Sequence, residues 1–153
     1  MIGDKITLLK ENLPPAQEIV DLIYNVIKFK NSPYVISIAG ESGCGKSTLS
    51  AALQFLFEQK SITTLVFHMD DYFLLPARSN HLAREKDINH VGVHEVNLDL
   101  LDQQLLEIKE QKKLIISKPL SDYTKNEITT EEINLTNIRL VIVEGTYTSL
   151  LNN

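Results

Sequence analysis

The chain contains very little cysteine, with Cys44 alone among its 153 residues. A single cysteine excludes an internal disulfide and suits a reducing compartment. No run approaches the roughly 20 apolar residues that are needed to span a bilayer. Residues 1–10 also lack the long apolar core and the small-residue cleavage site of a secretory signal. These absences predict a soluble, cytoplasmic protein without a membrane partner.

Basic residues are in short supply as well, with 15 Lys and Arg against 20 Asp and Glu and a formal net charge of -5. This balance argues against a broad surface for nucleic acid, although a local basic pocket for phosphates stays compatible with it. The hydrophobic fraction of 43% and the charged fraction of 23% are ordinary for a globular protein. A chain of this length predicts one domain with a sizeable core.

Predicted strands alternate with predicted helices along the chain. The sequence patterns predict helices over 16–29, from Lys46 onward, and after a cap at Asn97, and they predict strands over 34–39, 64–67, 114–116 and 139–143. Residues 74–93 are polar and predict a loop with at most a short helix, and the segment after Ile116 predicts a polar connection. The alternation predicts an α/β fold, with a parallel sheet and helices on both of its faces.

The most informative segment is a glycine-rich loop between a predicted strand and a predicted helix. It reads Gly40-Glu41-Ser42-Gly43-Cys44-Gly45-Lys46-Ser47 and matches the pattern G-x-x-x-x-G-K-[ST]. Its backbone N–H groups and the following helix N-terminus form an anion site. In such a loop the lysine, Lys46, reaches the β and γ phosphates, and the hydroxyl of Ser47 binds Mg²⁺. The predicted ligands are ATP and Mg²⁺, and the predicted nucleotide-binding residues are Gly40, Glu41, Ser42, Gly43, Cys44, Gly45, Lys46, Ser47 and Thr48.

Acidic residues follow two of the predicted strands. Asp70 and Asp71 come after the strand at 64–67, and Glu144 comes after the last strand. In an open parallel sheet, ligands bind beyond the carboxyl ends of the strands. A carboxylate at this edge can hold Mg²⁺ or take the proton of an acceptor hydroxyl. A solvated turn and a surface glutamate are the alternative interpretation.

Taken together, the phosphate loop, the segment Met69–Phe73 and the segment Val141–Gly145 resemble the uridine kinase and phosphoribulokinase family of P-loop kinases. Members of that family phosphorylate a hydroxyl of a small metabolite from ATP. The resemblance implies that Asp70 is the general base, with Asp71 in reserve because a shift of one residue would also place an aspartate there. It implies further that Lys46 is the second catalytic residue and that Glu144 joins Ser47 near Mg²⁺. The resemblance covers residues 35–150.

The chain departs from the family on the acceptor side. Val91-Gly92-Val93 stands where uridine kinases carry a D-H-P-type stretch, and Ser121 stands where they place an aromatic against the base. These two positions argue against uridine itself. The family resemblance still implies a uridine-like nucleoside as the leading acceptor, with pantothenate or a sugar phosphate as alternatives. Three histidines of the loop are candidate acceptor contacts, although solvated histidines are commoner there and their spacing fits no zinc site; they are His81, His90 and His94.

Family members continue beyond the last strand with more strands and an arginine-bearing lid. The resemblance therefore implies that residues 34–153 are the N-terminal part of a longer kinase core, preceded by a helical extension at residues 1–33. The outer edge of the strand at 35–39 would then be open in this chain. A short protein that binds nucleotide but turns over poorly is the alternative.

The predicted function is transfer of the γ-phosphate of ATP to a hydroxyl of a small metabolite. One alternative is a regulatory module in which ATP binding alone changes the affinity for a partner. Another is a DNA-processing ATPase, against which the acidic charge balance argues. Self-association is left open.

Overall fold

A computed structural model of the chain describes residues 1–3, 6–8 and 10–152. Residues 4, 5 and 9 of the predicted N-terminal extension, and residue 153, lie outside the described part. The helices are α1 (Leu13–Phe29), α2 (Lys46–Gln59), α3 (Ala77–Lys86) and α4 (Leu98–Lys109). The strands are β1 (Tyr34–Ala39), β2 (Thr64–His68), β3 (Ile115–Asp122), β4 (Glu127–Asn134) and β5 (Leu140–Gly145).

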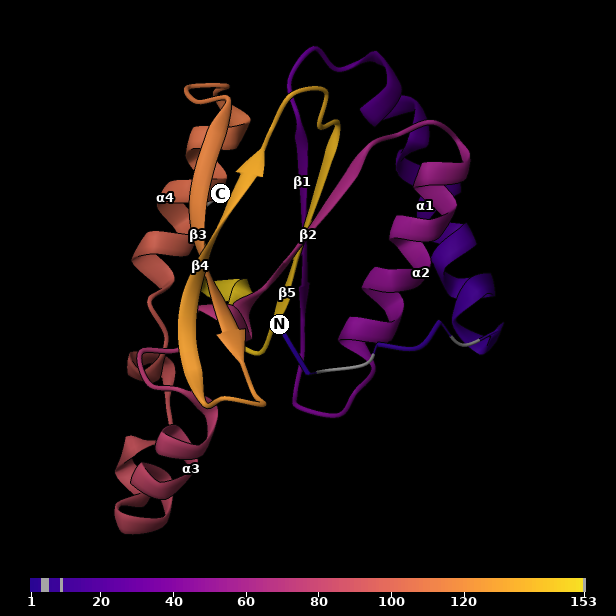
Figure 1. Cartoon of the computed structure of the whole chain (residues 1–153). Coiled ribbons are helices and arrows are strands. Elements are labelled where there is room, and N and C mark those ends of the chain that lie inside the picture. The colour runs from indigo at the N-terminus through magenta and orange to yellow at the C-terminus, as the bar shows by residue number, and fades with distance from the viewer. Residues whose placement is uncertain (4–5, 9, 153) are drawn as a thin grey trace.

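Three strands form a parallel sheet in the order β1-β5-β2 (Figure 1). The last strand in the sequence is thus the middle strand in space. Its register places Glu144 beside Ile38 of β1 on one side and beside His68 of β2 on the other. All three strands therefore end at the same edge of the sheet, which is where a ligand is expected.

Helices cover both faces of this sheet, as the sequence predicts (Figure 1). Successive side chains of a strand point to opposite faces. Accordingly, Val141 and Val143 of β5 pack in the core beneath α4. Leu140 and Ile142 pack in the core that α1 and α2 share. All four side chains are at most 1% exposed, so the predicted α/β class with a parallel, doubly covered sheet is confirmed.

The predicted polar connection after Ile116 is wrong. Residues 115–134 form an antiparallel hairpin of β3 and β4, with Ile116 paired to Ile133 and Asp122 paired to Glu127. The threonines of β4 favour a strand, and its partly buried side chains at Ile128 and Ile133 are separated by mostly exposed polar ones. A strand with one solvated face has too little apolar character to be distinguished from a loop by composition.

Other boundaries differ in smaller ways. The first helix begins at Leu13, three residues before the predicted start. The predicted loop at 74–93 contains α3, a helix of 10 residues that lies at the same end of the molecule as the carboxyl ends of the strands (Figure 1). The predicted cap of α4 is confirmed, because the Asn97 side chain accepts a hydrogen bond from the N–H of Leu100 at 3.1 Å.

The outer edge of β1 carries no strand partner among residues 1–3, 6–8 and 10–152, which agrees with the open edge that the sequence predicts. None of the helices in those ranges is both long and apolar enough to cross a bilayer.

Gly145, at the end of the middle strand, allows a close packing contact with the turn after β2. A Cβ added at Gly145 would lie 2.3 Å from Cβ of Met69, and Met69 is buried in the core. We expect Gly145→Ala to lower the free energy of unfolding by about 1–3 kcal/mol, the usual cost of overpacking. Chemical denaturation measures this. Gly92→Ala is the control, since its added Cβ would meet only the rotatable His94 ring, and an equal loss in both variants would contradict the packing argument.

Candidate active site

The glycine-rich loop connects β1 to α2 as the sequence predicts. Gly43 and Gly45 have φ values of 80° and 92°, in the left-handed region that side chains disfavour. The helix begins immediately afterwards, at Lys46. Since the first N–H groups of a helix have no partner within it, they are available to an anion at this end of α2.

The polar side chains of the loop make contacts within the loop and toward β5. The ammonium group of Lys46 donates to the carbonyl of Glu41 at 2.7 Å, and Thr48 donates to the carbonyl of Gly45 at 2.8 Å. The hydroxyl of Ser47 donates to Oε1 of Glu144 at 3.2 Å. The structure thus brings together Ser47 and Glu144, the two residues that the sequence nominates for Mg²⁺. Cys44 is exposed and has no contact that suggests a role.

Glu144 lies at the floor of the site and is 4% exposed. It is not the surface residue of the alternative interpretation. The ring nitrogen Nδ1 of His68 is 2.7 Å from Oε1 of Glu144, the oxygen that also accepts from Ser47. Sequence reasoning missed His68, because its place opposite Glu144 depends on the order β1-β5-β2. The only signal in the sequence is its position directly before Met69 and the aspartate pair.

Two adjoining cavities open beside these residues. The first has a volume of about 240 Å³ and is lined by the phosphate loop, the end of β5 and the turn after β2, with Lys46, Ser47, Asp70 and Glu144 on its wall. The second, of about 180 Å³, is lined by residues from that turn, from α3 and from β3, including Ser121 and Tyr123. Three residues line both cavities: Asp70, Phe73 and Arg84. A larger hollow of about 470 Å³ lies at the start of α4, away from the phosphate loop.

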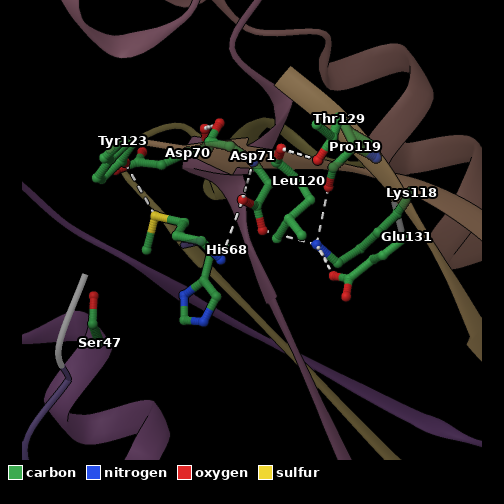
Figure 2. A network of polar contacts seen from close by, with 12 residues as sticks. Ser47, His68, Asp70, Asp71, Lys118, Pro119, Leu120, Tyr123, Thr129 and Glu131 are labelled. Carbon is green, nitrogen blue, oxygen red and sulfur yellow. Dashed lines mark hydrogen bonds and ion pairs between the residues drawn. The ribbon is translucent and has the colours of Figure 1, made fainter. Parts of the chain in front are cut away.

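Asp70 and Asp71 have different surroundings, although they are neighbours in the chain. Asp71 is fully buried, and its carboxylate lies beside the ammonium group of Lys118 (Figure 2). Its carboxylate is 2.8 Å from the ammonium group of Lys118 and accepts the N–H of Ser121 at 2.9 Å. Asp70 is partly buried and lines both cavities. Of the two candidates for a general base, Asp70 alone faces the space that substrates could occupy.

Burial raises the pKa of Asp70, and the nearby carboxylate of Glu144 raises it further, whereas His68 and Lys46 oppose the shift. A carboxylate with a raised pKa is a stronger base toward a hydroxyl proton. The environment of Asp70 therefore suits proton abstraction better than that of an ordinary surface aspartate.

Sequence reasoning also missed Arg84, and it included Phe73 in the segment Met69–Phe73 without giving that residue a role. Arg84 comes from α3, within the stretch predicted mainly as a loop, and its guanidinium carbon lies 5.4 Å from the centre of the Phe73 ring. Arg84 belongs to no recognisable motif. The three candidate histidines lie on the wall of neither cavity, and these are His81, His90 and His94.

The oxygen atoms of Ser47 and Glu144 are the hard donors that Mg²⁺ prefers. Within the described ranges of the chain, no group of three or more His, Cys, Asp or Glu side chains is placed to hold a metal ion. The donor set therefore fits a cation that takes few ligands from the protein and the rest from phosphates and water, as Mg²⁺ does in nucleotide sites.

The family model described as "Phosphoribulokinase / Uridine kinase family" matches residues 35–152, and the chain belongs to this family. A uridine kinase of Bacillus cytotoxicus is 32% identical over 117 residues, which are 75% of this chain and 52% of that protein. A uridine kinase of Ligilactobacillus salivarius is 28% identical over 116 residues, 76% of this chain and 52% of that protein. The chain thus spans about half the length of these curated relatives.

Solved structures show the same fold. The "Possible Uridine Kinase" from Bacillus stearothermophilus superposes with a TM-score of 0.68 at 20% identity, covering 87% of this chain and 72% of that one. At this level of identity the similarity establishes the arrangement of helices and strands, which is that of the P-loop kinases.

The buried Lys118 holds the hairpin against the turn that carries both aspartates. Its ammonium group is 2.8 Å from Asp71 and 2.8 Å from Glu131 of β4 (Figure 2). We expect Lys118→Ala to cost about 1.5–3 kcal/mol in the free energy of unfolding, because it removes the nearer of the two cations beside the buried Asp71 carboxylate, the other being the N-terminal ammonium group of Met1 at 3.4 Å. Chemical denaturation measures the loss, with the exposed Lys109→Ala as control. A cost for Lys118→Ala no larger than that of the control would show that Asp71 is not held by this pair.

Proposed function

We propose that this protein is an ATP-dependent kinase that transfers the γ-phosphate to a hydroxyl of a small metabolite. The observation that carries the proposal is the position of Asp70 on the wall shared by the two cavities. One cavity adjoins the phosphate loop and the other does not. A base at their junction can reach a hydroxyl that enters from the second cavity and attacks a phosphate held in the first.

The polar groups of the phosphate loop, Asp70 and Glu144 each have a role in this proposal. The loop amides and the α2 N-terminus bind the phosphates of ATP. Lys46 exchanges its bond to the Glu41 carbonyl for the β and γ phosphates, as the lysine of a P-loop does. Ser47 and Glu144 would hold Mg²⁺, and the cation would supply neutralisation of the charge on the phosphates. Asp70 accepts the proton of the attacking hydroxyl.

The acceptor belongs to the second cavity. The relatives named uridine kinase favour a nucleoside. However, Ser121 is small, its hydroxyl donates to the backbone carbonyl of Asp70 at 3.1 Å, and it offers no ring for a base to stack on. A sugar phosphate or a hydroxy acid such as pantothenate is the alternative acceptor. A nucleotide-binding module without turnover is the alternative function.

Replacement of Lys46 tests nucleotide binding. We expect Lys46→Ala to weaken binding of Mg-ATP by roughly tenfold to a hundredfold, because hydrogen bonds to charged groups contribute about 1.5–3 kcal/mol. Titration calorimetry gives the dissociation constants. Lys60→Ala, just past the other end of the same helix, is the matched control and should bind as the unaltered chain does. Equal affinity of the Lys46 variant would remove ATP from the proposal.

Replacement of Asp70 tests the reaction. We expect Asp70→Asn to leave Mg-ATP binding nearly unchanged and to lower acceptor-dependent release of ADP by roughly a hundredfold or more, since the variant cannot take the proton. The base acts when deprotonated and burial raises its pKa, so turnover of the unaltered chain should fall with decreasing pH at values above the ordinary aspartate range.

A coupled ADP assay over a series of pH values measures both effects, with the exposed Asp99→Asn as the control. Unchanged turnover in the Asp70 variant would exclude Asp70 as the base. Tight ATP binding without any acceptor-dependent ADP release would favour the regulatory module.

A further inference from the structure

Among the residues that the structure describes, Arg84 is the only positively charged one on the wall of the second cavity. The other lining residues are Asp70, Phe73, Leu75, Ala77, Asn80, Ser121 and Tyr123. Lys46 lies on the wall of the first cavity only, beside the phosphate loop. Arg84, whose side chain is 37% exposed, thus shares this wall with one carboxylate, that of Asp70, and otherwise with apolar and neutral side chains.

Arg84 is held in place by a buried carboxylate. Its Nε is 2.5 Å from Oε2 of Glu95, whose side chain is fully buried. The same oxygen accepts from the amide of Asn80 at 2.8 Å, and the other oxygen of Glu95 accepts the N–H of Gly92 at 2.7 Å. Burial raises the pKa of Glu95, but the hydrogen bonds from Arg84, Gly92 and Asn80 outweigh this and leave the pKa below its usual value. Glu95 is therefore ionised at neutral pH and fixes the guanidinium group.

The hydrogen bond to Glu95 uses only one of the five N–H donors of the guanidinium group. Within the described part of the chain, the hydrogen bond and ion pair of the Arg84 guanidinium group both use Nε, and neither terminal nitrogen has a hydrogen-bond partner. The group lies over the Phe73 ring, which lines both cavities, at 5.4 Å from the ring centre. Two parallel N–H groups held in this way match the two oxygens of a carboxylate or a phosphate.

From this arrangement we infer that Arg84 is a specificity residue for the acceptor, and that the acceptor carries an anionic group, a carboxylate or a phosphate, besides its reactive hydroxyl. The inference rests on the proposed kinase function and narrows its substrate class. The anionic group binds the terminal nitrogens of Arg84, and the hydroxyl lies toward Asp70. The cavity volume of about 180 Å³ agrees with a compact acceptor, since pockets for drug-sized ligands measure about 300–1,000 Å³.

A role in structure alone would need only the bond from Nε to Glu95. A role toward the transferred phosphate is a second alternative, because Arg84 also lines the first cavity. The three roles predict different effects of replacing Arg84 on the preference for one acceptor over another. Only an acceptor contact changes the preference for an anionic compound over its neutral counterpart.

Matched pairs of compounds test the inference. Glycerol and D-glycerate differ by a carboxylate, and ribose and ribose 5-phosphate differ by a phosphate, while uridine serves as a neutral nucleoside. Calorimetry on the full chain with Mg²⁺ and a non-hydrolysable ATP analogue gives binding without turnover. We expect the anionic member of at least one pair to bind about tenfold or more tightly than its neutral partner and than uridine, the scale of one charge-assisted contact. The pair that shows the preference identifies carboxylate or phosphate.

Arg84→Gln should abolish this preference and leave binding of the ATP analogue unchanged. Arg78→Gln is the matched control, because Arg78 is an exposed arginine of the same helix that lines neither cavity. Equal binding within both pairs, tighter binding of uridine, or the same change in both variants would overturn the inference. Lower turnover with every acceptor and an unaltered preference would overturn it too, and would place Arg84 on the transferred phosphate.

If Arg84→Gln does not fold, the binding of the paired compounds to the unaltered chain still tests the inference. Failure of the proposed function is a separate result. It would appear as the absence of phosphorylated product with every compound in the ADP assay, whereas the binding preference is measured without turnover.

Discussion

The structure depends on the position of β5 between two parallel partners. Among the described strands β5 is the last in the sequence, yet its side chains pack into the cores on both faces of the sheet, and Glu144 is its next-to-last residue. Parallel pairing on both sides brings the ends of β1, β2 and β5 to one edge. The phosphate loop follows the end of β1, the aspartate turn follows the end of β2, and Glu144 lies at the end of β5. The site is therefore a consequence of the strand order, and no single segment could form it alone.

The two aspartates after β2 show how neighbouring residues of one type can serve different ends. A short 3-10 turn over Met69–Tyr72 directs Asp71 into the core and Asp70 toward the cavities. Asp71 joins the turn to the hairpin through Lys118 and the N–H of Ser121. Asp70 is the neighbour of Asp71 in the chain. The contacts that Asp71 makes outside the cavities therefore also fix the position of Asp70. A buried ion pair contributes little net stability, but it can specify one arrangement over others.

Much of the fold could be predicted from the sequence, and the reasons are physical. The phosphate loop is local in the sequence, so its pattern specifies its conformation. The apolar runs at 34–39 and 139–143 correspond to the strands β1 and β5, of which β5 is buried throughout and β1 only in part. The hairpin at 115–134 could not be predicted, since one face of it is solvated and its buried Lys118 reads as a surface residue. In the site, the loop, Glu144 and the aspartate pair are visible in the sequence. His68 and Arg84 are not, because they meet the others only through tertiary packing.

The strand order also has a consequence for how the molecule opens. Exposing Glu144 requires the loss of two hydrogen-bonded ladders at once, so the floor of the site belongs to the most cooperative unit of the fold. The opposite wall is built by α3 and its 3-10 neighbours, which belong to no ladder of the parallel sheet in the described part of the chain, so it can open separately in a sub-global fluctuation. The two halves of the site therefore differ in the free energy that is needed to open them. Opening of the α3 wall can therefore expose the two cavities while the glycine-rich loop and Glu144 keep their places in the sheet region.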